Sequence, residues 1–210
     1  MKAVNAERLR TGHGRRPGKL ERTRHKLVQA LREEIGETGN FTAERVAARA
    51  GTSPATFYNH FDTKDDALVA AYQALMADLS QLVARRCQIE NLLDEGGREF
   101  VSNWLLQTAE FFAGNSRLFR LAQAAIERSR ELRELFRRQE ESVIEVYRRF
   151  IELGQSAGLI RDGDSLAMAQ VLVVITEGWY HPLIQRLEPG SPLHAEMTGA
   201  LTRMLAPDNM

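Results

Sequence analysis

The sequence has a single cysteine, no long apolar run and no net charge, and each of these features excludes a class of protein. Because Cys87 stands alone, no intrachain disulfide can form, which indicates a reducing compartment. No stretch is apolar over the length of a membrane span, and the N-terminus lacks the apolar core of a secretory signal. We therefore expect a cytoplasmic protein that does not enter a membrane.

Catalytic and metal-binding motifs are missing as well. No HExxH, GxSxG or Walker sequence occurs, and Cys87 has no neighbours that would mark it as a nucleophile. The histidines show no metal-ligand spacing, and they are His13, His25, His60, His181 and His194. We expect no enzymatic activity, no cofactor and no metal ion.

Charge is unevenly divided along the chain, although the 28 basic and 28 acidic residues balance. Residues 1–64 contain 13 Lys and Arg against 7 Asp and Glu, and residues 1–26 alone contain nine against two. The rest of the chain is therefore acidic. A basic head that binds nucleic acid on a more acidic body gives this division. A basic tail that is only solvated and binds nothing would produce the same division of charge.

The segment from Thr42 to Lys64 begins like a short helix that stops at a tight turn. Thr42 can cap the helix start, because its hydroxyl accepts a free backbone N–H of the first turn. We place this helix at Ala43–Ala50. Gly51 follows, and glycine tolerates the left-handed backbone that a sharp turn requires.

A second short helix is expected at about Pro54–His60. Ser53 can cap it, and proline at the first helical position is already set for a helix. Phe57 and Phe61 are four residues apart and would pack inward from one face. Two small helices joined by a glycine-containing turn form a helix-turn-helix, whose second helix enters the major groove of DNA.

The residues from Ala47 to Leu68, AARAGTSPATFYNHFDTKDDAL, resemble the DNA-binding domain of the tetracycline-repressor (TetR) family of bacterial transcription regulators. Gly51 matches the turn glycine of that family. The family signature, F-Y-x-H-F-x-x-K-x-x-L as it stands in this chain, is matched by Phe57, Tyr58, His60, Phe61, Lys64 and Leu68.

The resemblance implies that Tyr58, His60 and Lys64 contact DNA phosphates. It also implies that the second helix reaches the bases, where a threonine can hydrogen-bond a base edge or offer its methyl group to thymine. With their neighbours, the candidate DNA-binding residues of this segment are Thr42, Thr52, Ser53, Pro54, Ala55, Thr56, Tyr58, Asn59, His60 and Lys64.

One position departs from the family pattern. Some members carry a base-reading Arg or similar residue early in the first helix of the unit, where this chain has Ala43 and Glu44. Glu44 can accept a hydrogen bond from a cytosine amino group. Alternatively it only favours a helix N-terminus, and we favour this second interpretation.

Residues 1–18 contain glycines and a proline among arginines and have no hydrophobic period, so we predict a flexible basic arm. By resemblance such arms can lie along DNA, and Arg15 and Arg16 are the candidates for a minor-groove contact. We divide the remainder into a helix-turn-helix DNA-binding domain, residues 19–64, and an effector-binding and dimerisation domain, residues 65–210.

No segment alternates like a strand, so the sequence predicts an all-α fold. We expect a first helix at about Leu20–Thr38 and a long helix from Asp62 or Thr63 to about Cys87, which links the head to the body. The other expected helices are Leu93–Ala113, a short helix ending near Ala125, Ser129–Gly154, Ser165–Thr176 and Leu193–Leu205.

The two last helices fit a dimer interface. Ser165–Thr176 has no charge and is expected to be buried on most sides, and Leu193–Leu205 is amphipathic. We predict that each subunit of a homodimer contributes this pair to a four-helix bundle. Alternatively the pair only completes the core of a monomer. A dimer would carry two heads to successive major grooves about 34 Å apart.

By resemblance the body is a sensor, in which a small-molecule effector enters a pocket among the middle helices and the long helix moves the heads out of register with DNA. Several residues could line this pocket or could equally be plain core: Trp104, Phe111, Phe112, Phe119, Tyr147, Trp179, Tyr180 and His181. We expect Pro182 to kink a helix at the pocket wall. An apolar effector, aromatic or acyl, would fit such a lining.

These features together predict a sequence-specific regulator of transcription that binds double-stranded DNA. The resemblance adds a ligand-responsive repressor that acts as a homodimer on a palindromic operator. The alternative is a helical small-molecule-binding protein whose DNA-binding head is no longer used.

Overall fold

The computed structural model describes residues 18–178 and 181–207, and the regular secondary structure of this part is helical. In chain order the helices are α1 Lys19–Thr38, α2 Ala43–Arg49, α3 Pro54–Tyr58, α4 Lys64–Arg86, α5 Ile89–Glu95, α6 Gly97–Gly114, α7 Ser116–Ile126, α8 Arg130–Ser156, α9 Ser165–Glu177, the 3-10 helix η2 Ile184–Arg186 and α10 Pro192–Leu205. The prediction of an all-α fold is confirmed for the described residues.

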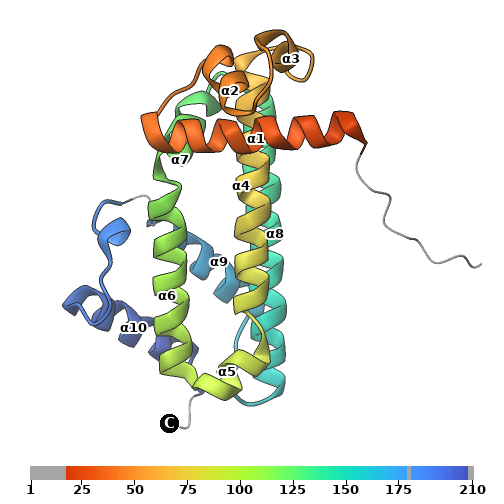
Figure 1. The fold of residues 1–210 in the computed structure, drawn as a ribbon. Coiled ribbons are helices and arrows are strands. Elements are labelled where there is room, and N and C mark those ends of the chain that lie inside the picture. Colours follow the sequence, from red (N-terminus) through yellow and green to blue (C-terminus); the bar gives the residue numbers. More distant parts are fainter. Residues whose placement is uncertain (1–17, 179–180, 208–210) are drawn as a thin grey trace, which may run out of the picture.

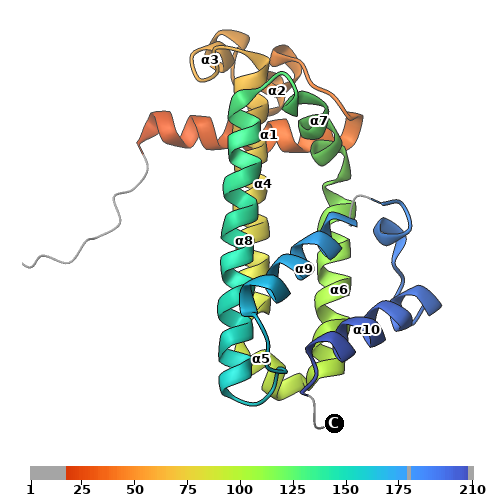
Figure 2. The ribbon, with the colours of Figure 1, turned by 180° about the vertical axis from the view of Figure 1, so that it is seen from behind.

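The helices gather in two parts (Figures 1 and 2). Helices α1–α3 lie together at one end, and we call them the head. Helices α5–α10 form the larger part, which we call the body. Helix α4 begins under the head and runs the length of the body beside α8.

Helix α1 is buried only from Leu27 onward. Leu27, Leu31 and Ile35 recur four residues apart and are inaccessible to solvent, so this face packs on α2 and α4. The helix ends at Gly39, whose φ of 77° lets its N–H bond the carbonyl of Ile35. The last three turns of α1 therefore form the floor on which the two short helices rest.

Helix α4 begins at a capping box. The Thr63 hydroxyl accepts from the Asp66 N–H at 3.1 Å, and the Asp66 carboxylate accepts from the Thr63 N–H at 2.8 Å. By length and composition alone this helix could cross a membrane, contrary to the expectation that no segment would. More than half of its most apolar stretch, 56%, is buried inside the protein, where it packs on α1, α7 and α8, and a long core helix meets the same criterion.

The predicted helix Leu93–Ala113 begins too early, because its first residues belong to a separate helix, α5, and α6 starts at Gly97. Gly96 separates the two helices, and its φ of 77° and ψ of 156° are not helical. Glycine adopts that conformation without strain. At this corner Arg86 of α4 pairs with Glu95 and donates a hydrogen bond of 2.8 Å to the carbonyl of Phe100.

The predicted kinked helix around Pro182 is also wrong. Helix α9 ends at Glu177, and Pro182 lies in a turn before η2. His181 is exposed in that turn, and its Nδ1 accepts from the Leu183 N–H at 3.2 Å. A proline just past a helix end frees no internal carbonyl, so no kink arises.

Helix α9 is more exposed than its lack of charge predicts. It packs on α8 through Met168, Ala169 and Leu172, yet the side chain of Val174 is 65% exposed, and Leu166 and Val171 are each 45% exposed. Helix α10 packs on α6 instead. Both helices lie on the side of the body that faces the viewer in Figure 2.

Candidate nucleic-acid interface

The turn between α2 and α3 forms as the sequence predicts. Thr42 Oγ1 accepts from the Arg45 N–H at 3.3 Å and caps α2, and Ser53 Oγ accepts from the Thr56 N–H at 3.2 Å and caps α3. Gly51 between them has φ 67°, in the left-handed region. These local bonds set α3 at a defined angle to α2.

A buried glutamate joins α1 to α2. Glu34 is only 3% exposed, and it pairs with Arg45 and with Arg49, whose Nη2 lies 3.0 Å from Glu34 Oε2. Arg49 of α2 also donates a hydrogen bond to Glu37 of α1, and this hydrogen bond lowers the pKa of the Glu37 carboxyl. A buried carboxylate needs such partners, so this network holds α2, and α3 with it, against α1.

The aromatic side chains in and just after α3 are buried or exposed as predicted. Phe57 is fully buried and Phe61 is 2% exposed, and their ring centroids lie 5.1 Å apart under the helix. Tyr58 is 50% exposed and meets the Phe57 ring edge-on. The aromatic pair therefore anchors the helix while Tyr58 remains available to a partner.

The other predicted DNA-binding residues lie close by in the chain and reach the surface to different degrees. Ser53, Pro54, Ala55, Asn59 and Lys64 are exposed. Thr42, Thr52, Thr56 and His60 are half-buried. Arg15 and Arg16 lie outside the described residues.

Two of these side chains are held by internal contacts. Thr56 Oγ1 lies 3.0 Å from Ser53 Oγ, so the hydroxyl pair is oriented before any base arrives. Lys64 Nζ lies 5.9 Å above the ring of Phe41. The ammonium group thus sits at the start of α4, next to the end of α3.

Glu44 behaves as a residue of a helix start. Its own backbone N–H and then the Thr42 hydroxyl bond the carboxylate and lower its pKa. This arrangement favours the interpretation that Glu44 complements the N-terminus of α2. Glu44 is exposed, and so is Ala48, which lies one turn further along the same helix.

The body contains a cavity of about 580 Å³ between α4, α7 and α8. Its apolar wall includes two stacked ring pairs, Tyr72 with Phe136 at 4.5 Å and Phe112 with Phe119 at 4.7 Å. Its polar lining residues are Gln123, Arg137, Gln139 and Glu140. A concave apolar site with a few polar groups of this size fits a small organic molecule.

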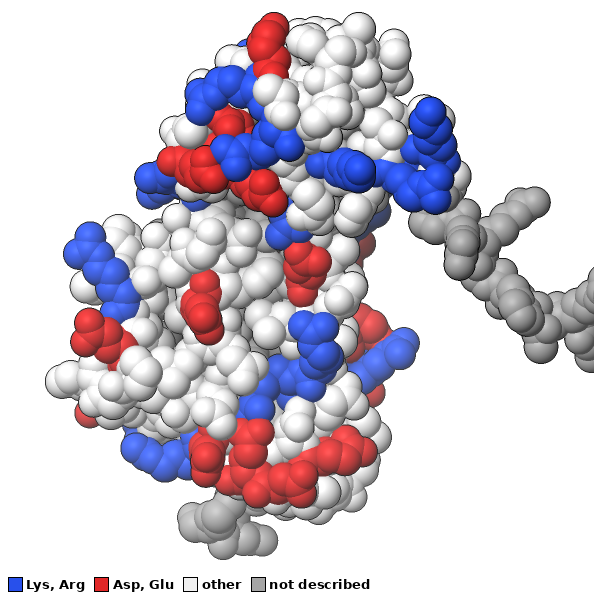
Figure 3. All heavy atoms as spheres, viewed as in Figure 1, with Lys and Arg blue, Asp and Glu red and all other residues white. Residues whose placement is uncertain are grey.

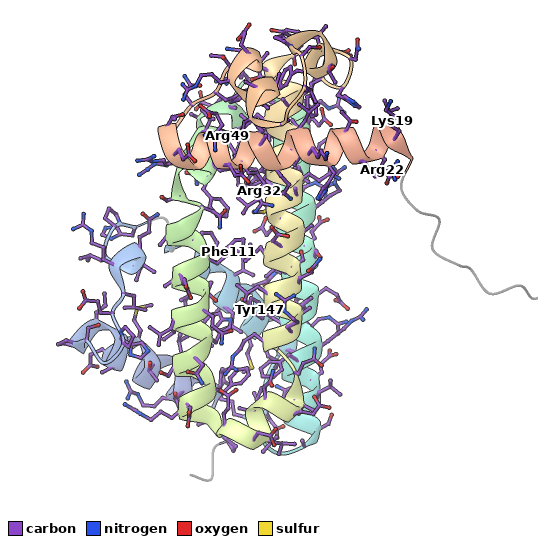
Figure 4. All side chains as sticks on the ribbon, viewed as in Figure 1. Lys19, Arg22, Arg32, Arg49, Phe111 and Tyr147 are labelled. Carbon is purple, nitrogen blue, oxygen red and sulfur yellow. The ribbon has the colours of Figure 1, made fainter. Side chains whose placement is uncertain are left out.

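The structure separates the aromatic residues that we expected to share one pocket. Phe112 and Phe119 line the large cavity, and Phe111 packs edge-on against both rings. Trp104 and Tyr147 lie together further from the head, as Figure 4 shows for Tyr147 relative to Phe111. His181 lines neither space, and Trp179 and Tyr180 lie outside the described residues.

Around Trp104 and Tyr147 there is room for about 10 Å³ only, so this cluster is packed core. Cys87 belongs to it, and burial raises the pKa of the Cys87 thiol to about 12. The residue is therefore an unreactive thiol. Sequence reasoning missed Tyr72 and Phe136 as cavity residues, because both occur within ordinary helical stripes.

A serine and a histidine meet in the body, where Ser102 Oγ lies 3.1 Å from His194 Nε2. The other ring nitrogen, Nδ1, accepts from the Gly190 N–H at 3.1 Å. In the neutral ring Nε2 must then carry the proton and donate it toward Ser102. This is the wrong tautomer for a base that activates the serine.

Among the described residues no group of three or more potential metal ligands occurs.

Solved structures with the same fold are numerous. A protein from Mesorhizobium loti MAFF303099, described as a TetR-family transcriptional regulator, is 16% identical with a TM-score of 0.74, over 90% of this chain and 100% of its own. The reduced form of Escherichia coli NemR is 20% identical with a TM-score of 0.67, over 88% and 98%. A complex of SmeT with triclosan is 20% identical with a TM-score of 0.62, over 90% and 93%. Among curated proteins no sequence matches the chain.

A helix-turn-helix with a buried aromatic anchor, capped helices and an exposed polar face defines a DNA-binding regulator of transcription. Residues 27–71 match the family model for bacterial regulatory proteins of the tetR family. This match confirms the resemblance read from Ala47–Leu68, and the whole chain shares its fold with solved structures described as TetR-family regulators.

Proposed function

We propose that this protein is a ligand-responsive repressor that binds a palindromic operator as a homodimer. The single observation that carries the DNA-binding part is the set of exposed Tyr58 and Lys64 with half-buried His60 around a short helix held by two buried phenylalanines. A bound dimer represses by occupying a promoter. The proposed phosphate contacts are those three residues with Thr52 and Ser53, and the proposed base contacts come from Pro54, Ala55 and Thr56.

The ligand response is supported by the cavity of about 580 Å³ and by its position. Its walls come from α4, which begins under the head, and from α7, which also packs on α1. The similar SmeT structure is a complex with triclosan, an aromatic compound. An apolar aromatic effector in this cavity would bear on α4 and α7, and through them on the head.

The homodimer is supported by the exposed apolar face of α9. Leu166, Val171 and Val174 lie on a helix whose one charged residue is its last, Glu177, and a monomer would leave these apolar side chains in water. Helix α10 on the same side of the body would complete the interface.

We place the proposed boundary between the DNA-binding and dimerisation domains at residue 64. We expect the protein to act in the cytoplasm.

The test is to recover bound fragments from the source genome with purified protein at near-physiological salt. A palindrome with half-sites about one helical turn apart would support a dimeric, sequence-specific regulator. A reporter driven from the promoter beside it should then be repressed, and released by the effector. Recovery of nothing above background, with and without candidate effectors, would contradict the proposal and favour a small-molecule-binding protein with an unused head.

A further inference from the structure

The first eight residues of α1 form a basic segment that projects from the head. We call Lys19–Lys26 the α1 extension. Every residue in it is exposed except the half-buried Thr23, and the buried face of α1 begins only at Leu27. Four cations share the extension with a single acid: Lys19, Arg22, Arg24 and Lys26, with Glu21. Figures 3 and 4 show this basic end of α1 standing clear of the body.

The cations of the extension have no carboxylate partner within the described residues. Arg24 alone makes a specific side-chain contact, over the ring of Phe61 at 5.5 Å. Elsewhere in the head the arginines are neutralised: Arg32 pairs with Asp78 at 2.8 Å, and Arg45 and Arg49 pair with acids of α1. Within the head, α1–α3, the uncompensated positive charge is therefore confined to the projecting end.

The charge order of α1 opposes its own dipole. Cations are unfavourable near a helix N-terminus, yet the extension carries four, and the last turn of α1 has no basic residue. The extension also buries almost no apolar surface, and Leu20 is 71% exposed. Neither stability nor packing accounts for this sequence, and such a local conflict marks a functional surface.

The position of the extension fits a long anionic partner beside α3. In both ribbon views the N-terminal end of α1 leaves the head on the side where α3 lies (Figures 1 and 2). Eight helical residues extend about 12 Å. One strand of duplex DNA presents a phosphate about every 3.4 Å, so this length covers roughly three or four phosphates.

We propose that the α1 extension binds the phosphate backbone of duplex DNA just outside the half-site that α3 reads. The inference rests on the proposed function, because it needs a head that binds DNA. Phosphate contacts carry no sequence information, so the extension would add affinity and fix orientation without changing the preferred bases. Its contacts would lie beyond those of Tyr58, His60 and Lys64.

The experiment compares two duplexes that contain the operator recovered by genomic selection. The short duplex ends at the outer edges of the two half-sites, and the long one adds eight base pairs of arbitrary sequence on each side. The test variant combines Lys19→Gln, Arg22→Gln and Lys26→Gln, and it keeps Arg24 because that residue contacts Phe61. Affinity is measured by fluorescence anisotropy over a range of salt concentrations.

A matched control removes the same charge from the opposite end of the molecule. It combines Arg85→Gln, Arg98→Gln and Arg149→Gln, at exposed positions near the end of α4, the start of α6 and the end of α8. Both triple variants are first checked for native helicity and thermal midpoint. The control should bind both duplexes as the wild type does.

We expect the test variant to bind the long duplex at least about 10-fold more weakly, with a salt slope shallower by about 3 for each subunit of the dimer, since each lost phosphate contact removes about 0.9. On the short duplex it should match the wild type within about twofold. If the test variant and the wild type have the same affinity and salt slope on each duplex, the inference is overturned and the proposed function is left intact. An equal loss on both would overturn it too, by placing the contacts inside the half-site.

Two further outcomes would also decide. Unchanged DNA binding by the variant, combined with loss of binding to vesicles of anionic phospholipid, would assign the extension to a membrane surface instead. Failure of the wild type to bind any duplex at low salt would overturn the proposed function and the inference with it.

Discussion

Lys64 is an exposed cation at the first residue of α4, next to the end of the helix-turn-helix. We predict that Lys64→Ala weakens binding to all DNA sequences alike and makes the salt slope shallower by about 1 for each bound subunit, because each head loses one phosphate contact. Salt-dependent anisotropy with specific and arbitrary duplexes measures both quantities. The capping box of Thr63 and Asp66 does not involve the Lys64 side chain, so α4 should keep its start.

Thr56 offers both a hydroxyl and a methyl group near the start of α3. We predict that Thr56→Ala shifts base preference at one position of each half-site by about 1–3 kcal/mol, as loss of a base contact does. Selection from a randomised duplex pool measures the preference. Thr56→Val separates the two groups, since it keeps a methyl and removes the hydroxyl that lies 3.0 Å from Ser53 Oγ. An unchanged preference in both variants would mean that Thr56 reads no base.

Glu95 is the partner of the buried Arg86, which is 7% exposed. The hydrogen bond from Arg86 lowers the pKa of Glu95, so the pair stabilises the fold at neutral pH, and this contribution is lost as pH falls through the lowered pKa. We predict that Glu95→Gln reduces the free energy of unfolding by about 3 kcal/mol at pH 7, because a buried cation loses its counter-charge. Urea unfolding at pH 7 and in acid measures this difference.

The difference between wild type and Glu95→Gln should shrink as pH falls from the ordinary pKa range of glutamate to the lowered pKa of Glu95, because below that value the wild-type carboxyl is neutral as well. Asn103→Ala is the control, because it removes only the 2.9 Å hydrogen bond from Asn103 Nδ2 to Glu95. A difference that stays constant with pH would contradict the assigned role of the charge.

At the scale of elements, Arg117 connects the body to the head. Its guanidinium donates to the carbonyls of Gly36 at 2.9 Å and of Glu37, so α7 supplies the cation that the C-terminus of α1 lacks. Just past the end of α7, Arg128 forms an ion pair of 3.3 Å with Asp65 in the first turn of α4. Because α7 also lines the cavity, these contacts couple the cavity wall to the floor of the helix-turn-helix.

We predict that Arg117→Ala lowers the free energy of unfolding by about 1 kcal/mol and speeds amide exchange in the last turn of α1, since that helix end loses the cation that bonds its free carbonyls. Hydrogen exchange with mass spectrometry and urea unfolding measure the two effects. Arg120→Ala is the matched control, because Arg120 is exposed on the same helix without a hydrogen bond or ion pair to the described residues. Equal behaviour of both variants would remove the coupling role.

At the scale of the whole molecule, α9 decides the oligomeric state under the proposed function. We predict that Val174→Glu converts a dimer to a monomer and weakens operator binding at least 10-fold, because a charge would be buried at the centre of the interface and the two heads would lose their spacing. Sedimentation equilibrium and anisotropy measure these effects. Ala124→Glu, at an exposed position of α7, should change neither. A monomeric wild type would contradict the dimer directly.

The sequence alone determined the helix-turn-helix almost to the residue. Thr42 and Ser53 cap the helices for which they were expected, Gly51 makes the turn, and of the two predicted starts of the long helix, Asp62 and Thr63, the structure has the second. These features depend on hydrogen bonds and backbone angles within a few residues of each other, and such bonds form whatever the rest of the chain does. The charge division and the burial of Phe57 and Phe61 followed from composition and helical spacing for the same reason.

Only the tertiary structure decided what the body looks like inside. Phe119 lines a cavity whereas Trp104 belongs to solid core, although both are aromatic residues on amphipathic helices. Tyr72 and Phe136 lie far apart in the chain and meet as a stacked pair, and Arg117 reaches a helix end on a different part of the fold. Such contacts join residues that are distant in sequence, so their geometry depends on how whole helices pack, and no local pattern encodes it.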